Sequence, residues 1–66
     1  MNVLINGESR DLPEGSTLQD VISLLQLQGR RLAIEINTEI VPRSLHTGRR
    51  LCEGDRIEIV HAIGGG

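Results

Sequence analysis

The residues with the clearest chemical potential stand at the carboxyl end of the sequence, where Gly64, Gly65 and Gly66 follow one another. Three successive glycines favour neither helix nor strand, and a passive tail is one interpretation. Residues 62–66 span roughly 17 Å when extended, at ~3.3–3.6 Å per residue, and the glycines among them, which have no side chains, would thread a narrow channel. A terminal carboxylate is ionised at neutral pH and must be activated, for example as an acyl-adenylate, before a nucleophile attacks it. The second interpretation therefore makes Gly66 the reactive residue and Gly64 and Gly65 the threading segment.

A few other side chains also suggest chemistry. Cys52 has no activating base near it in the sequence, and we interpret it as a small, semi-buried hydrophobe. A lone cysteine forms no internal disulfide and no metal site of several thiolates. His46 and His61 lack a third ligand nearby in the sequence, so no metal site is expected. Arg49 and Arg50 are expected on a solvated loop.

Length and composition narrow the classes of function. A chain of 66 residues forms one domain, residues 1–66, and is too short to enclose a deep cleft, so a self-contained enzyme is not expected. The net charge of −2 and the absence of aromatic residues argue against a nucleic-acid partner. No run approaches the ~18 apolar residues of a membrane span, and the first residues lack a basic signal-peptide region. The expected location is therefore the cytoplasm, away from membranes.

The helical segment follows Pro13. A capping box is available from Ser16 with Gln19 or from Thr17 with Asp20, and the sequence leaves both open. Gly29 is the expected residue just after the helix, with two arginines beside it that favour the negative end of the helix dipole. The apolar residues fall on one helical face, at Leu18, Val21, Ile22 and Leu25.

The remaining segments have the character of strands. Residues 3–5 and 8–12 form a predicted hairpin around Asn6-Gly7, the pair that best suits a type I′ turn. Residues 32–36, 40–41 and 56–62 complete the set. If the first and last strands pair, they run parallel, with the helix in the crossover. The predicted fold is α+β, with a single mixed sheet covered on one face by one helix. The residues expected beneath the helix are Val3, Ile5, Ile34, Ile36, Ile57 and Ile59.

The outward face of this sheet carries a second candidate site. Leu4 and Val60 point away from the predicted core, and they would be adjacent if their strands pair. With Ile63 they would form an apolar patch near the glycines, suited to docking a partner.

These segments together resemble a known family over the whole chain. The resemblance rests on Asn6-Gly7, on residues 16–20 that open the helix, on residues 36–43, and most on residues 53–60 leading into 63–66. The chain resembles the ubiquitin-like β-grasp family and, more closely, its ThiS branch, the sulfur carriers of bacterial thiamine biosynthesis. The related molybdopterin carriers also end in Gly-Gly, but they are typically longer and richer in aromatic residues.

The resemblance implies a mechanism and partners. A ThiF-like adenylating enzyme would use ATP and Mg²⁺ to make an acyl-adenylate at Gly66, while the carrier itself binds no cofactor. A cysteine desulfurase-type donor would then supply sulfur, giving a Gly66 thiocarboxylate. A ThiG-like thiazole synthase would move that sulfur into the thiazole phosphate of thiamine. Two alternatives stay open: a carrier for molybdopterin synthesis or tRNA thiolation, and a β-grasp interaction module whose glycines are passive.

Overall fold

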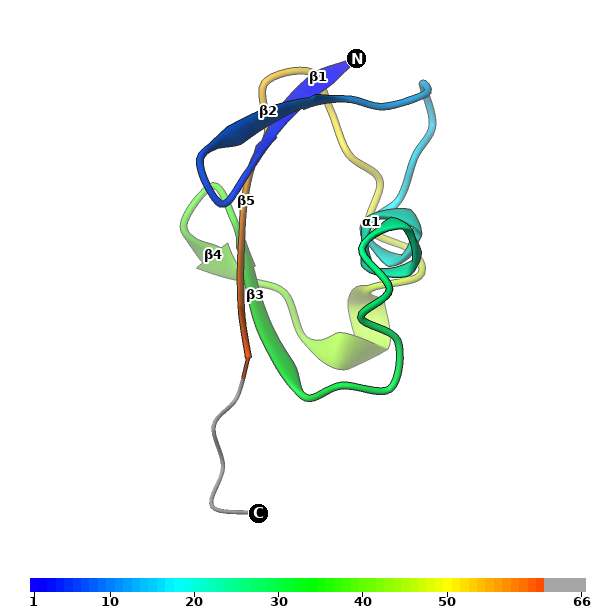
Figure 1. The fold of residues 1–66 in the computed structure, drawn as a ribbon, viewed down its shortest axis with the longest axis vertical. Coiled ribbons are helices and arrows are strands. Elements are labelled where there is room, and N and C mark those ends of the chain that lie inside the picture. The colour runs from blue at the N-terminus through cyan, green and yellow to red at the C-terminus, as the bar shows by residue number, and fades with distance from the viewer. Residues whose placement is uncertain (62–66) are drawn as a thin grey trace.

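In the computed structural model, which describes residues 1–61, five strands form one sheet and one α-helix packs against one of its faces (Figure 1). The strand order across the sheet is β2-β1-β5-β3-β4. The predicted tail, residues 62–66, lies outside the described residues. The elements are β1 (Asn2–Ile5), β2 (Glu8–Asp11), α1 (Leu18–Leu24), β3 (Leu32–Ile36), β4 (Glu39–Ile40), a 3₁₀ helix (Arg43–Leu45) and β5 (Arg56–His61).

The last strand lies at the centre of the sheet. β5 pairs in parallel with β1, where Ile5 lies opposite Ile57, and antiparallel with β3 from Leu32–His61 to Ile36–Ile57. The chain therefore passes from β1 to its parallel neighbour through α1, which covers the crossover face (Figure 1). The predicted mixed sheet and the parallel pairing of the first and last strands are confirmed.

The hairpin turn between β1 and β2 also supports β5. Asn6 and Gly7 have positive φ angles of 50° and 85°, as the type I′ prediction requires. The Asn6 side chain then hydrogen-bonds to the backbone of β5, as a further strand residue would. Its Oδ1 accepts a hydrogen bond from the Ile59 amide at 2.8 Å, and its Nδ2 donates to the Ile59 carbonyl at 3.3 Å. A side-chain amide thus extends the contact between β1 and β5 past the end of β1.

The beginning of α1 is settled by one of the two possible capping boxes. Thr17 Oγ1 accepts a hydrogen bond from the Asp20 amide at 3.3 Å, and Asp20 Oδ2 accepts one from the Thr17 amide at 2.8 Å. Ser16 instead donates its hydroxyl to the Pro13 carbonyl at 2.7 Å, in the turn before the helix.

The end of α1 differs from the prediction. The helix stops well before Gly29, and Gln26 takes the left-handed position with a φ of 58°. The Gln26 amide donates to the Ser23 carbonyl at 3.0 Å, and the Leu27 amide to the Ile22 carbonyl at 2.9 Å. This bond pair is a Schellman motif, which turns the half-buried Leu27 back against the core. Apolar packing of Leu27 outweighs the preference for glycine, so the prediction for Gly29 was wrong.

The core lies between α1 and the sheet. Every residue predicted beneath the helix is buried, as are three of the four residues on the predicted helical face; the fourth, Leu25, is half-buried. The predicted strand limits shift slightly, since Leu12 and Val41 lie just outside β2 and β4 with buried side chains. The buried apolar residues that the periodicity did not predict are Leu12, Val41 and Leu51. No helix within residues 1–61 has the length and apolar character needed to cross a membrane.

The helix–sheet contact can be tested at Ile22, which is 4% exposed. Ile22→Ala should lower the free energy of unfolding by about 2–5 kcal/mol, because it removes buried methyl groups and leaves a cavity. Leu24→Ala is the matched control, since Leu24 lies in the same helix and is 53% exposed. The control should change stability by less than about 0.5 kcal/mol in urea denaturation. Equal effects from the two variants would contradict the observed orientation of α1.

Candidate functional site

The site begins where β5 ends. His61 is exposed and pairs with Leu32 of β3, so hydrogen bonding continues to the last described residue of the strand. The predicted reactive and threading residues, Gly64, Gly65 and Gly66, lie outside the described residues, as does Ile63. What the structure describes is the strand that leads into them and the sheet face on which that strand lies.

The start of β5 is held by a polar cluster around the buried side chain of Asp55. Asp55 is 7% exposed, and both of its carboxylate oxygens accept hydrogen bonds, Oδ1 from Asn37 Nδ2 at 3.0 Å and Oδ2 from the Cys52 amide at 2.8 Å. Asn37 Oδ1 in turn accepts from the Arg56 amide at 3.0 Å. These bonds join the turn after β3 to the residues just before β5. Because both carboxylate oxygens are paired, the cluster fixes the position of β5 without leaving a buried charge unsatisfied.

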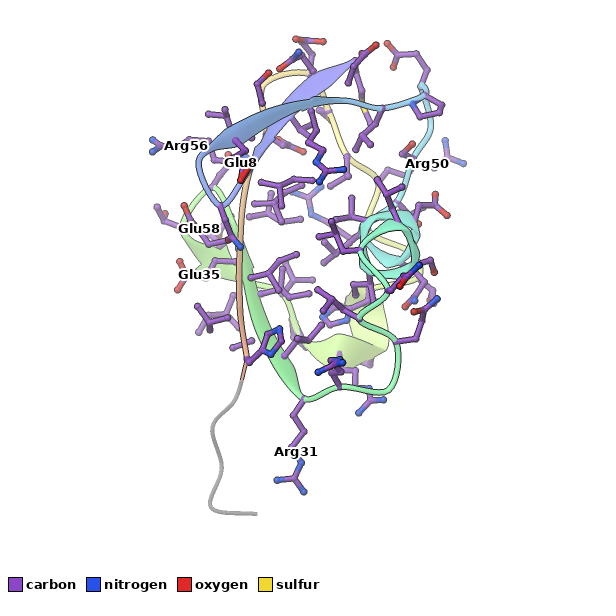
Figure 2. All side chains as sticks on the ribbon, viewed as in Figure 1. Glu8, Arg31, Glu35, Arg50, Arg56 and Glu58 are labelled. Carbon is purple, nitrogen blue, oxygen red and sulfur yellow. The ribbon has the colours of Figure 1, made fainter. Side chains whose placement is uncertain are left out.

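The face of the sheet away from α1 is open. Paired residues share a face, so the register sets which side chains meet there. Figure 2 shows Glu35, Glu58 and Arg56 on the side of the sheet away from the helix. The residues that the register gives to this open face include Leu4, Ala33, Glu35, Ile40, Arg56, Glu58 and Val60.

The predicted adjacency of Leu4 and Val60 is wrong, although both lie on the open face. Leu4 is opposite Arg56, whereas Val60 is opposite Ala33 of β3. Val60 lies four positions after Arg56 along β5. Leu4, which is beside Arg56, is therefore roughly 13 Å from Val60 along the strand, at about 3.3 Å per residue. The error arises because the register places Leu4 beside the first residue of β5, whereas β3 is the strand that accompanies β5 as far as Val60.

Two features of the open face were not recognised from the sequence. Val60, 59% exposed, and the exposed Ala33 make an apolar pair near the end of β5. Two residues nearer the start of β5, Glu58 lies directly opposite Glu35 of the neighbouring strand β3. Like charges in directly opposed positions repel, so this acidic pair lowers the stability of the free domain. The signal available in the sequence was the outward position of each acid, but their proximity depends on the strand register.

The other residues singled out in the sequence lie apart from this face or differ from expectation. Cys52 is exposed, which contradicts the semi-buried prediction, because the preceding Leu51 takes the buried position. His46 is 6% exposed, with its Nε2 at 3.1 Å from the Val41 carbonyl. Arg50 projects into solvent, as expected (Figure 2). Within residues 1–61 no three histidine, cysteine, aspartate or glutamate side chains gather as a possible metal site.

Comparison with known proteins identifies the family. The family model described as "ThiS family" matches residues 3–66. The chain belongs to the ThiS family. A crystal structure of the thiamine biosynthesis protein ThiS from Geobacter metallireducens superposes with a TM-score of 0.85 and 26% identity, covering 100% of both chains. The predicted ubiquitin-like β-grasp fold is confirmed, and ThiS proteins are sulfur carriers of thiamine biosynthesis.

Two relatives show how the chain sits within this family. The sulfur carrier protein ThiS of Bacillus subtilis is 40% identical over 50 residues, which cover 76% of each chain. A thiazole synthase of Paramagnetospirillum magneticum is 39% identical over 100% of this chain. That alignment covers only 20% of the thiazole synthase, so the chain spans about a fifth of that relative's length.

The acidic pair of the open face gives a stability prediction. Glu58→Gln should raise the free energy of unfolding by about 0.2–1 kcal/mol, because it removes the repulsion from Glu35. Urea denaturation at low salt measures this gain, and about 1 M NaCl should shrink it by screening. Glu39→Gln is the control, since Glu39 lies opposite Ile36 rather than an acid. A loss of stability on Glu58→Gln at low salt would contradict the repulsion.

Proposed function

We propose that this chain carries sulfur for thiazole formation in thiamine biosynthesis, and that Gly66 is the residue that bears the sulfur. The observation that carries the proposal is the ThiS family match over residues 3–66, which includes the glycines. The geometry supports it, because β5, the central strand of the sheet, ends at His61, three residues before the first glycine in the sequence. A rigid domain that ends in side-chain-free residues suits the presentation of a carboxylate to another protein.

The chemistry required of Gly66 follows from the low electrophilicity of a carboxylate. A carboxylate oxygen attacks the α-phosphate of ATP on a partner enzyme, pyrophosphate leaves, and an acyl-adenylate forms. A persulfide sulfur from the donor then attacks the carbonyl carbon, and AMP leaves with its electron pair. A thiol cleaves the resulting acyl disulfide and releases the thiocarboxylate. The carrier contributes the carboxylate and the surface by which each partner recognises it.

The partners follow from this sequence of steps. An adenylating enzyme of the ThiF kind uses ATP and Mg²⁺ to form the acyl-adenylate. A cysteine desulfurase-type enzyme provides the persulfide. The sulfur acceptor is a thiazole synthase. This last assignment draws support from the Paramagnetospirillum thiazole synthase, a fifth of which resembles this chain.

The open sheet face is the proposed surface for these partners. Val60 with Ala33 offers an apolar contact near the end of β5, and Ile63 is proposed to extend it. Leu4 would meet a different part of the partner, because it lies on β1 beside Arg56, at the start of β5. The acidic pair formed by Glu35 and Glu58 favours a basic group on the partner between these contacts.

The alternative functions differ in the acceptor or in the role of the tail. A carrier for molybdopterin synthesis or tRNA thiolation would form the same thiocarboxylate but would not donate its sulfur to thiazole synthase. An interaction module with passive glycines would show no mass change with ATP, the adenylating enzyme and the sulfur donor. The similarity to ThiS of Bacillus subtilis and to a thiazole synthase favours the thiamine pathway.

Deletion of Gly66 tests the reactive residue. The carboxylate would withdraw by one residue, ~3.3–3.6 Å, whereas reacting atoms must approach to about 3–3.5 Å. Thiocarboxylate formation, followed by intact mass with the adenylating enzyme, ATP and the sulfur donor, should therefore be lost. The melting temperature should stay unchanged, because the core lies within residues 1–61. Normal sulfur loading of the shortened chain would rule out Gly66 as the acceptor.

Gly65→Val tests the threading role of the glycines. A narrow channel admits bare backbone but not a branched side chain, and valine also restricts the backbone. We expect unchanged thermal stability and a severe loss of sulfur loading or of delivery to thiazole synthase. Gly65→Ala is the graded control and should retain more activity, because it adds one methyl group. Wild-type rates of loading and delivery for Gly65→Val would favour the passive-tail alternative.

A further inference from the structure

A cavity of about 260 Å³ lies apart from the open face, between α1, the loop that follows it and the segment around the 3₁₀ helix. Its apolar lining comes from three aliphatic residues, among them Ile22 and Leu32. Its polar lining consists of Gln19, Gln28, Arg30, Arg43, His46 and Thr47. The carrier function proposed above uses none of these polar groups.

The charges that line the cavity have one sign. Arg30 and Arg43 contribute two guanidinium groups, and no carboxylate is among the lining residues. Neither arginine forms an ion pair within 4.0 Å with an acid of residues 1–61. The chain as a whole has a net charge of −2, so this concentration of positive charge is local. Unpaired guanidiniums beside an apolar wall retain their donors for an anion, which they bind in bidentate fashion.

The wall that carries Arg43 is held in place by His46. The His46 amide donates to the Arg43 carbonyl at 3.1 Å, and the Gln19 amide of α1 donates to the His46 carbonyl at 3.1 Å. The buried His46 ring lies with Nε2 at 3.1 Å from the Val41 carbonyl. Because a carbonyl only accepts, Nε2 carries the proton, and this hydrogen bond holds the ring against Val41. The cavity thus has a wall fixed to α1 rather than a loose loop.

We propose that this cavity binds a phosphate group, either as inorganic phosphate or as part of a small phosphate monoester. Two guanidiniums, two side-chain amides and a hydroxyl supply donors for the oxygens of a phosphate. The volume lies below the ~300–1,000 Å³ typical of drug-sized ligands, which favours a small anion. Leu32 lines the cavity and pairs with His61 at the end of β5, so the bound anion would lie at the end of the domain that leads to Gly66.

The experiment is an NMR titration of the full 66-residue chain with inorganic phosphate, in which chloride keeps the ionic strength constant. We expect saturable shifts confined to the amides of residues 28–30 and 43–47. Arg30→Gln and Arg43→Gln should each weaken binding about tenfold, the loss of one charge-assisted contact. Arg50→Gln is the matched control and should bind as the wild type does, since Arg50 is exposed and is not among the residues that line the cavity (Figure 2).

A parallel titration with AMP identifies the source of the phosphate. AMP binding with the same arginine dependence supports a monoester, and inorganic phosphate binding alone supports the free anion. Shifts that do not saturate, equal weakening by Arg50→Gln, or binding of a glutamate-rich peptide in place of phosphate would each overturn the proposal. None of these measurements needs a partner enzyme, so their failure leaves the sulfur-carrier proposal intact.

Discussion

The pairing of β5 between β1 and β3 is the interaction on which the rest of this structure depends. A parallel pair cannot be joined by a tight turn, so the chain must cross over one face, and α1 lies in that crossover. Burial of one sheet face under α1 follows, with Ile57 and Ile59 of β5 at the centre of the core. The strand that leads to the glycines is therefore also the strand most firmly bound into the domain.

Amide side chains secure this central strand near both limits of its pairing with β1. Asn6 bonds to the backbone of Ile59 where β1 has already ended, and Asn37 bonds to Arg56 where β5 begins. Asp55 completes the second cluster with both carboxylate oxygens satisfied. Such side-chain bonds hold a short strand in register where the neighbouring backbone turns away, and a small domain depends on them because its apolar core is limited.

The alternation of side chains along β5 separates the residues of the core from the face that we propose as a partner surface. Residues on one face build the core, while Glu58 and Val60 face away from it beside Glu35 and Ala33. The open face carries an exposed apolar pair, Ala33 with Val60, and two like charges, and neither feature stabilises the free domain. Features that cost stability in the isolated protein are suited to a surface completed by a partner. The cavity beside α1 lies away from this surface and has the opposite charge.

The order of the strands and the α-helix, the inward residues of β1, β3 and β5, the Asn6-Gly7 turn and the family could all be predicted from the sequence, because they depend on local periodicity, turn chemistry and motif. Gly66 as the reactive residue stays a prediction. The end of α1 could be seen only in the folded domain, where packing of Leu27 overrides the preference for Gly29. The same holds for the distance between Leu4 and Val60 and for the contact of Glu35 with Glu58. These contacts depend on register between strands distant in the chain, which side-chain alternation leaves undefined and only the packing of the whole sheet sets.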